Sequence, residues 1–168
     1  MEDLKPKKVS ESAIDFYPHE IFPNDLNPND LNPRGMVFGG KVLLMIDNVA
    51  GIVAQRHSRR TCVTAELDSV VFLAPAFKGE TLILKAALNR VWSSSMEIGV
   101  KIFAENFRTG ESRHVVSAYL TFVALGEDGH KIKINPVEPE TEDEKRRFRE
   151  ADERRIHRLK IKAEKSKK

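Results

Sequence analysis

The 168-residue sequence predicts an α+β fold, in which an antiparallel sheet of five to six strands curls around one long central helix. A charged helix is expected at the C-terminus. Three observations support this prediction. The segment from about Gly39 to Arg56 has helical character and is apolar on nearly every side, as expected for a buried helix. The segments that follow alternate apolar and polar residues and are rich in β-branched side chains. The connections between them suit antiparallel hairpins and not crossover helices.

The chain is expected to hold one globular domain with an extension at each end. We assign residues 1–11 to a flexible N-terminal lead, residues 12–139 to the domain, and residues 140–168 to a charged C-terminal helix with a basic tail. A domain of this size can bury on the order of two thirds of its unfolded surface, which is enough to form a core. Ser12–His19 is a candidate short strand at its start.

A short repeat precedes the long helix. The pentapeptide Pro-Asn-Asp-Leu-Asn at residues 23–27 recurs at residues 28–32 and is followed by Pro33. Pro and Asn at this density predict a loop. The period is too short for a solenoid, so we interpret the repeat as a local duplication that lengthened the loop.

Strands are predicted after the helix over Thr61–Ala74, Thr81–Trp92, Met96–Glu105 and Val115–Leu125. The third alternates cleanly, with one face formed by Met96, Ile98, Val100, Ile102 and Ala104. The opposite face carries Glu97, Lys101 and Glu105. A single curled sheet leaves edges and an open face, so dimerisation is expected on physical grounds.

The last segment has the signals of a helix start. Thr141 lies three residues before Glu144, which is a capping-box arrangement. Acidic residues occupy its first turn and Lys and Arg crowd its end, both favourable with the helix dipole. Its apolar residues are too sparse for a core helix. We therefore expect it to pack on the domain near Phe148 and to be solvated, or to face a partner, beyond Arg154.

The basic residues are concentrated in the tail. The formal net charge is +3, yet residues 140–168 carry 12 Lys and Arg against 8 Asp and Glu, so the rest of the chain is close to neutral. This balance argues against a nucleic-acid-binding core. The tail from Arg154 to Lys168 is expected to be solvated, with contact to ligand phosphates, anionic lipid or a neighbouring subunit as the alternative.

Several classes of protein receive no support from the sequence. Cys62 is the only cysteine, so no intrachain disulfide can form. The apolar runs are shorter than the ~18 residues of a membrane span, and Met1–Lys5 lacks the apolar core of a signal peptide. The five histidines show no metal-ligand spacing. We expect a soluble, cytoplasmic protein without a metal site.

Two features of the long helix point to a functional site. Asp47 lies inside an apolar helix, where an ionised carboxylate is costly unless it is paired, solvated or used. Gly39 and Gly40 begin the helix, where backbone N–H groups are unpaired and a ligand can approach closely. The alternatives are an Asp47 bonded to the backbone or to Asn48, and glycines that only permit a sharp turn.

These residues form a recognisable pattern. The run Asn32-x-x-Gly35-x-x-x-Gly39-Gly40-x(6)-Asp47 resembles the signature of the hotdog-fold acyl-CoA thioesterases, in particular acyl-CoA hydrolases related to brain acyl-CoA hydrolase. The likeness extends to Met45–Ala54, Ser95–Ile98 and Glu140–Lys145, and covers roughly His19 to Arg149. It implies the hotdog fold and hydrolysis of acyl-CoA to free fatty acid and CoA, without a metal or organic cofactor. It also implies dimers, often assembled as trimers of dimers.

The resemblance assigns roles at the helix. Asp47 is implied as the general base on water or as the nucleophile, and the Gly39 and Gly40 amides as an oxyanion hole. Asn32 matches the family's loop asparagine, which helps to hold the water or the carbonyl and faces Asp47 of the other subunit. The duplicated loop also offers Asn27 for this role, although the spacing to Gly35 favours Asn32. Either asparagine could instead be only a turn residue.

Weaker assignments concern CoA binding. Ser94, Ser95 and Met96, with Ser93 before them, fall where relatives bring pantetheine alongside the sheet. The alternative is a polar turn followed by a core methionine. Thr64, on the strand that faces the helix, has similarly weak support as a CoA contact.

Three alternatives to a thioesterase remain at this point. The chain could bind acyl-CoA without cleaving it, although a pure binder needs neither Asp47 nor Asn32. A hotdog dehydratase would carry a histidine at the helix start, which this sequence lacks. An interaction module could use the basic tail on nucleic acid or membrane.

Overall fold

The predicted long helix and the four strands after it are all present in the structure, a computed structural model that describes residues 4–16 and 31–165. Helix α1 spans Gly39–Ser58. The strands are β3 (Thr61–Phe72), β4 (Thr81–Val91), β5 (Ser95–Glu105) and β6 (Ser112–Leu125). Strand β2 (Ile14–Phe16) lies within the candidate strand at the start of the domain. Asn27 and most of the repeated loop lie outside the described residues.

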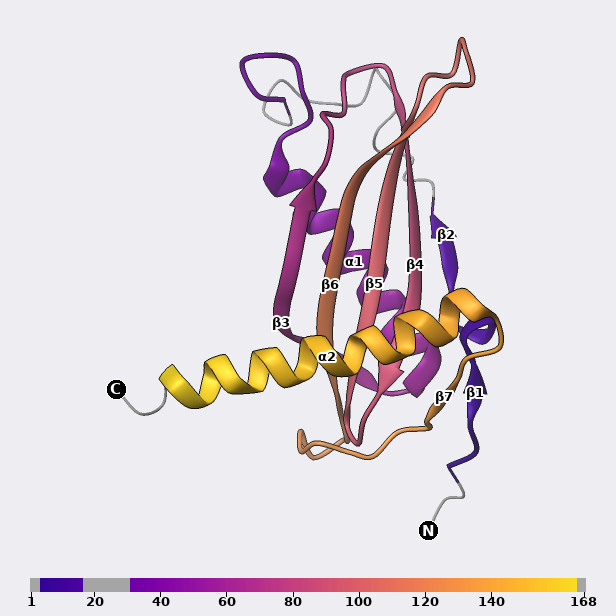
Figure 1. The fold of residues 1–168 in the computed structure, drawn as a ribbon, viewed down its shortest axis with the longest axis vertical. Helices are drawn as coiled ribbons and strands as arrows, with labels where there is room; N and C mark the ends of the chain where they lie inside the picture. Colours follow the sequence, from indigo (N-terminus) through magenta and orange to yellow (C-terminus); the bar gives the residue numbers. More distant parts are fainter. Residues whose placement is uncertain (1–3, 17–30, 166–168) are drawn as a thin grey trace.

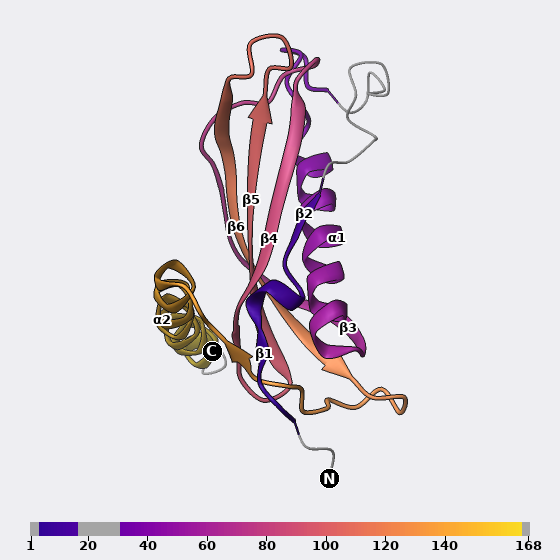
Figure 2. The same ribbon diagram turned by 90° about the vertical axis from the view of Figure 1, so that its right-hand side faces the viewer.

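The five strands form one antiparallel sheet in the order β2-β4-β5-β6-β3. Helix α1 lies along one face of this sheet, and helix α2 (Glu142–Lys165) crosses the opposite face (Figures 1 and 2). We call these the inner and the outer face. β3, the strand that follows α1, forms one edge of the sheet.

A second, small sheet joins the two ends of the domain. Strand β1 (Lys7–Lys8) pairs in parallel with β7 (Val137–Glu138), and a 3₁₀ turn at Val9–Glu11 follows β1. Residues 7–11 therefore have regular structure within the segment assigned to the N-terminal lead.

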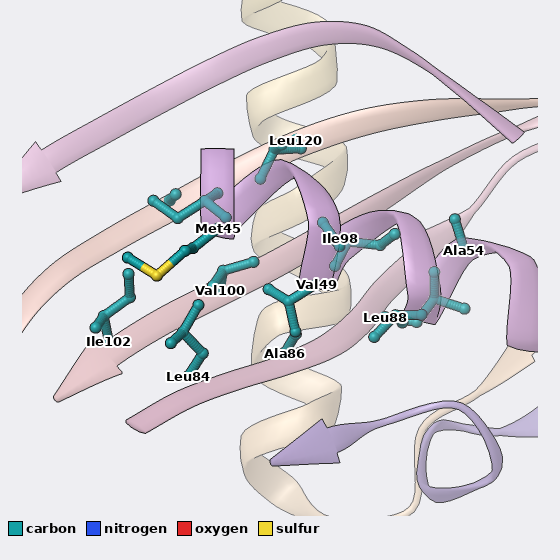
Figure 3. Packing of buried hydrophobic residues seen from close by; sticks show 14 of the residues in the cluster. Met45, Val49, Ala54, Leu84, Ala86, Leu88, Ile98, Val100, Ile102 and Leu120 are labelled. Atoms are coloured by element: carbon teal, nitrogen blue, oxygen red, sulfur yellow. The ribbon is translucent and has the colours of Figure 1, made fainter. Parts of the chain in front are cut away.

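The core lies between α1 and the inner face of the sheet. The alternating apolar residues of β5, from Met96 to Ala104, are buried there, as the pattern predicted. Met45, Val49 and Ala54 of α1 point toward them (Figure 3). The helix is not buried on every side, however, because Leu44 and Ile52 are 54% and 41% exposed. These two side chains lie on the exposed surface of α1, on either side of the exposed Asn48.

Helix α2 begins as the sequence predicted. The Thr141 hydroxyl accepts a hydrogen bond from the Glu144 amide at 3.2 Å, and the Glu144 carboxylate accepts one from the Thr141 amide at 3.0 Å. Phe148 packs against the edge of the core, also as expected.

The outer face of β5 is covered and not solvated. Glu97 is 0% exposed, and Nη2 of Arg154 lies 2.7 Å from its Oε1. Nδ2 of Asn89 donates a second hydrogen bond to the same oxygen, at 3.0 Å. The charge alternation placed Glu97 on the polar face but gave no sign that α2 lies over it.

Beyond Arg154 the expectation of a solvated or partner-facing helix holds only in part. Ile156 and Leu159 are 69% and 51% exposed, consistent with a solvated or partner-facing surface. The Arg158 side chain, in contrast, is only 11% exposed and forms ion pairs with β3.

We predict that Arg154→Ala destabilises the protein strongly. The substitution leaves the buried Glu97 carboxylate without its cation, which typically costs about 3–5 kcal/mol of unfolding free energy. Urea unfolding measures this loss. Arg149→Ala, an exposed arginine of the same helix, serves as the control and should change the unfolding free energy by less than about 0.5 kcal/mol. Equal stability of the two variants would contradict the prediction.

A second prediction concerns acid pH and His57, at the end of α1. His57 is 1% exposed, and its Nε2 lies 2.8 Å from the Asn135 carbonyl oxygen. Burial lowers the pKa of His57 below its ordinary value. Between that lowered pKa and about 6.5 the unfolded chain binds a proton that the folded chain does not, so stability falls as pH drops through this range.

Urea midpoints at pH 7.5, 6.5 and 5.5 test this expectation. The wild-type midpoint should fall more steeply with acidification than that of His57→Gln, which has no titrating group at this site. Parallel curves for the two proteins would rule His57 out as the cause.

Candidate active site

Asp47 and Thr64 form the central contact of the site. Asp47 lies in the third turn of α1 and is partly exposed. The Thr64 hydroxyl of β3 donates a hydrogen bond to its Oδ1 at 2.6 Å. One carboxylate oxygen is therefore held in a fixed orientation by a side chain from another element.

An irregularity of β3 determines where Thr64 points. Thr64 is in register with Phe122 of β6, and Glu66 is in register with Thr121, so Ala65 is an extra residue. In a regular strand, residues two apart face the same side. Because of the bulge, Thr64 lies on the inner face with Phe122, whose ring lies beside Gly51 of α1, whereas Glu66 lies on the outer face.

The start of α1 presents open backbone amides. The helical hydrogen bonds begin with the Lys41 and Val42 amides, which both donate to the Phe38 carbonyl oxygen at 3.0 and 3.2 Å. The Gly39 and Gly40 amides precede them, and Phe38 makes no side-chain cap at this end. At the Gly39 Cα a methyl group would meet only the Phe72 ring, at 3.6 Å. This end of the helix can therefore accept a closely approaching oxygen.

A cavity of about 490 Å³ opens beside Gly39. Asn32 and Gly39 line it together, and most of its wall is apolar, including Val42, Leu82, Ile102 and Val116. All four of these side chains belong to the buried core, so the cavity extends from the helix start toward the interior. Its lining suits an apolar chain with a polar group at the Gly39 end.

Asn32 organises the loop that leads to the helix. Its Oδ1 accepts hydrogen bonds from the Arg34 amide at 2.9 Å and the Met36 amide at 3.2 Å. Gly35, with φ +72°, turns the chain between them. Asn32 therefore does act as a turn residue through its side-chain oxygen. Its side-chain nitrogen, Nδ2, is the donor that remains for a ligand.

The structure does not bring all predicted site residues to one place. Gly39 and Asp47 are separated by about two helical turns, or ~12 Å along the axis at ~1.5 Å per residue. Asn32 and Gly39 share the cavity, whereas Asp47 and Thr64 contact each other. Within one chain these are two separate pairs.

Ser94, Ser95 and Met96 lie at the turn from β4 to β5, at the end of the sheet where α1 finishes (Figure 1). Met96 is 0% exposed and belongs to the core, and the Ser94 and Ser95 carbonyl oxygens accept backbone hydrogen bonds. These contacts match the alternative of a polar turn followed by a core methionine.

The role of Thr64 as partner of Asp47 was missed from the sequence, because the two residues are 17 positions apart on different elements.

The remaining candidate groups are accounted for differently. The Cys62 thiol is a free cysteine that lies 3.1 Å from the Ser58 hydroxyl, and burial raises its pKa, which does not favour a nucleophile. The described part of the chain contains no group of three or more His, Cys, Asp or Glu that could hold a metal ion. Neither helix, over its described residues, is long and apolar enough to cross a membrane.

Comparison with known proteins places this arrangement in a family. A family model described as the thioesterase superfamily matches residues 34–111. The chain is 44% identical over 108 residues to the uncharacterized acyl-CoA thioester hydrolase YkhA of Bacillus subtilis, covering 64% of this chain and 63% of that protein. It is 35% identical over 119 residues to the human cytosolic acyl coenzyme A thioester hydrolase, covering 70% of this chain and 31% of that protein. The chain thus spans less than two thirds of the length of either relative.

Three solved structures superpose on this chain over nearly its whole length. An acyl-CoA hydrolase from Bacillus cereus superposes with a TM-score of 0.88 at 36% identity, over 97% of this chain and 96% of that one. A hexameric acyl-CoA thioesterase gives 0.87 at 34% identity, over 95% and 98%. The acyl-CoA hydrolase of Staphylococcus aureus, solved with butyryl coenzyme A and coenzyme A, gives 0.84 at 33%, over 96% and 94%.

A central helix wrapped by one antiparallel sheet, with an acid in the helix and open amides at its start, defines a hotdog-fold protein of the thioesterase type. This chain belongs to the thioesterase superfamily. Its similar proteins include acyl-CoA hydrolases of bacteria and mammals.

Proposed function

We propose that the protein hydrolyses acyl-CoA thioesters to free fatty acid and CoA. The observation that carries this proposal is the apolar cavity that opens at the unpaired amides of the α1 start. An acyl chain would occupy its apolar wall, and the thioester carbonyl would lie near the Gly39 amide. The complex of the S. aureus hydrolase with butyryl coenzyme A supports the same substrate class.

The S. aureus enzyme also supports the choice of residues. Its solved variants include alanine substitutions of one aspartate, one asparagine and one threonine. These three positions are spaced along that chain as Asp47, Asn32 and Thr64 are spaced along this one. We therefore include Thr64 in the proposed catalytic machinery and not among the CoA contacts.

The geometry supports a separate role for each residue. The Thr64 hydroxyl fixes Oδ1 of Asp47, so that Oδ2 is free to take a proton from water as the general base, or to attack the carbonyl as the nucleophile. The Gly39 and Gly40 amides would stabilise the oxyanion, a contribution of roughly 3–4 kcal/mol for each donor. The Nδ2 of Asn32 would hold the water or the carbonyl oxygen. This chemistry needs no metal or organic cofactor.

The site would be completed by a second subunit. Asn32 and Asp47 have separate partners within one chain, and β3 is an open edge with exposed Val63, Leu67 and Val71. Helix α1 also exposes Leu44 and Ile52, which a second subunit would cover. We propose a homodimer in which Asn32 of one subunit faces Asp47 of the other, assembled as a trimer of dimers. The hexameric acyl-CoA thioesterase supports this assembly. As a separate proposal, we place the protein in the cytoplasm.

The first test is the release of CoA from acetyl-, octanoyl- and palmitoyl-CoA. We predict that Asp47→Asn lowers kcat at least about 100-fold, because the isosteric amide cannot take the proton. The amide oxygen can still accept the Thr64 hydrogen bond, so the fold should be kept. Glu127→Gln, the same carboxylate-to-amide change at an exposed turn after β6, is the control and should stay within about twofold of wild type.

Full activity of Asp47→Asn would show that the acid is misassigned. Absence of wild-type turnover with tight CoA binding would instead establish the acyl-CoA-binding alternative.

A further prediction separates the two uses of Asn32. Asn32→Asp keeps an oxygen for the Arg34 and Met36 amides but removes the Nδ2 donor. We expect kcat to fall at least about tenfold while the melting temperature stays close to that of wild type. Asn32→Ala should lose activity and also about 1 kcal/mol of stability, since both turn hydrogen bonds disappear. Wild-type kcat in Asn32→Asp would reduce Asn32 to a turn residue.

A further inference from the structure

Strand β3 contains two irregularities close to the proposed catalytic threonine. The register with β6 shifts between Thr64 and Glu66, and again between Leu67 and Ser69. Ala65 and Asp68 are therefore extra residues within a few positions of each other. A bulge interrupts the ladder of hydrogen bonds and bends the strand. As the edge strand, β3 has only β6 beside it within the sheet.

On the outer face of the sheet, an arginine of α2 binds the irregular part of β3. Arg158 of α2 places Nη1 2.6 Å from Oδ2 of Asp68 and Nε 3.5 Å from Oε2 of Glu66. Asp68 and Arg158 are only 8% and 11% exposed at their side chains, so solvent screens this pair weakly. One guanidinium therefore binds both acids that follow the first bulge.

The second bulge is also tied to the neighbouring strand. The Thr121 hydroxyl of β6 donates a hydrogen bond to Oδ2 of Asp68 at 2.9 Å. Asp68 thus links β3 to β6 and to α2 through a single oxygen. Without the arginine, the Glu66 and Asp68 carboxylates would share one face of the strand and repel each other.

We propose that Arg158 is a positioning residue for the reaction, holding the double bulge of β3 so that the Thr64 hydroxyl reaches Asp47. The inference rests on the proposed function. The bulge at Ala65 is what allows Thr64 to face α1 while Glu66 faces α2. A displacement of about 1 Å at a reacting group can cost on the order of 100-fold in rate. If the loss of Arg158 on the outer face let the bulge return to regular strand geometry, Thr64 on the inner face would move and the reaction rate would fall.

The attachment of α2 does not depend on this arginine alone. Arg154 binds the buried Glu97 on β5, and Asp152 accepts a hydrogen bond from the Trp92 indole at 2.8 Å. These contacts remain when Arg158 is replaced. A loss of activity in an Arg158 variant can thus be separated from undocking of the helix.

The test compares Arg158→Ala with Arg155→Ala. Arg155 is on the same helix and lies over the Trp92 ring at 4.4 Å, so its replacement removes similar packing without touching β3. We expect Arg158→Ala to lower kcat about tenfold with KM within about twofold, and Arg155→Ala to leave both unchanged. Arg158→Lys, which keeps the charge, should recover part of the loss.

A double-mutant cycle identifies the route of the effect. In a Thr64→Val background, which has no hydroxyl to position, Arg158→Ala should lower kcat by less than about twofold. The same tenfold fall in both backgrounds would overturn the proposal, because Arg158 would then act independently of Thr64.

Amide hydrogen exchange gives a readout that needs no activity. Arg158→Ala should accelerate exchange in residues 64–69 of β3, and Arg155→Ala should not. Unchanged exchange in β3 would also overturn the proposal. If the wild type hydrolyses no acyl-CoA, the proposed function fails, and this comparison alone decides whether Arg158 holds the strand.

Discussion

The packing of α1 against the inner face of the sheet is the constraint on which the rest of the structure depends. The buried stripe of α1, from Val42 to Ala54, meets the alternating apolar residues of the sheet, and this contact fixes both the rotation and the position of the helix along its axis. Those two quantities decide where the amides of Gly39 open and which strand Asp47 faces. A rotation of the helix by one residue, about 100°, would carry Asp47 away from Thr64 and place it in the core or in solvent. The site is therefore a consequence of core packing.

The sheet connects two chemically different environments. Its inner face is apolar and holds α1, while its outer face carries acids that meet arginines of α2. Strand β3 contributes to both, because its first bulge allows Thr64 and Glu66, two residues apart, to face opposite ways. A regular strand of the same sequence could not place Thr64 on α1 and Glu66 on α2. The bulged backbone of β3 therefore connects the Asp47–Thr64 contact on the inner face with helix α2 on the outer face.

Most of the fold could be predicted from local patterns. The 3.6-residue and two-residue periodicities located α1 and the four strands after it to within a few residues, and the Thr141–Glu144 capping box located the start of α2. The motif from Asn32 to Asp47 directed attention to the helix start and its acid. These features are visible in sequence because each depends on residues a few positions apart.

What the sequence did not reveal depends on contacts between distant segments. The Asp47–Thr64 hydrogen bond, the buried Glu97 and the β3 bulges all require knowledge of which strand lies beside which, and period-two alternation cannot signal an extra residue. The Asn32 turn is a partial exception, since asparagine before a glycine often bonds its own backbone. Coordinates were needed to show that the Asn32 side-chain oxygen accepts hydrogen bonds from the Arg34 and Met36 amides.

The burial of Glu97 has a consequence for the order in which the chain can mature. Its cation, Arg154, lies 57 residues later in the sequence. At about 5–20 residues per second of synthesis, several seconds pass between the synthesis of Glu97 and that of Arg154. The outer surface of β5 thus remains hydrated until α2 has been synthesised, and only then can the outer face of the sheet close.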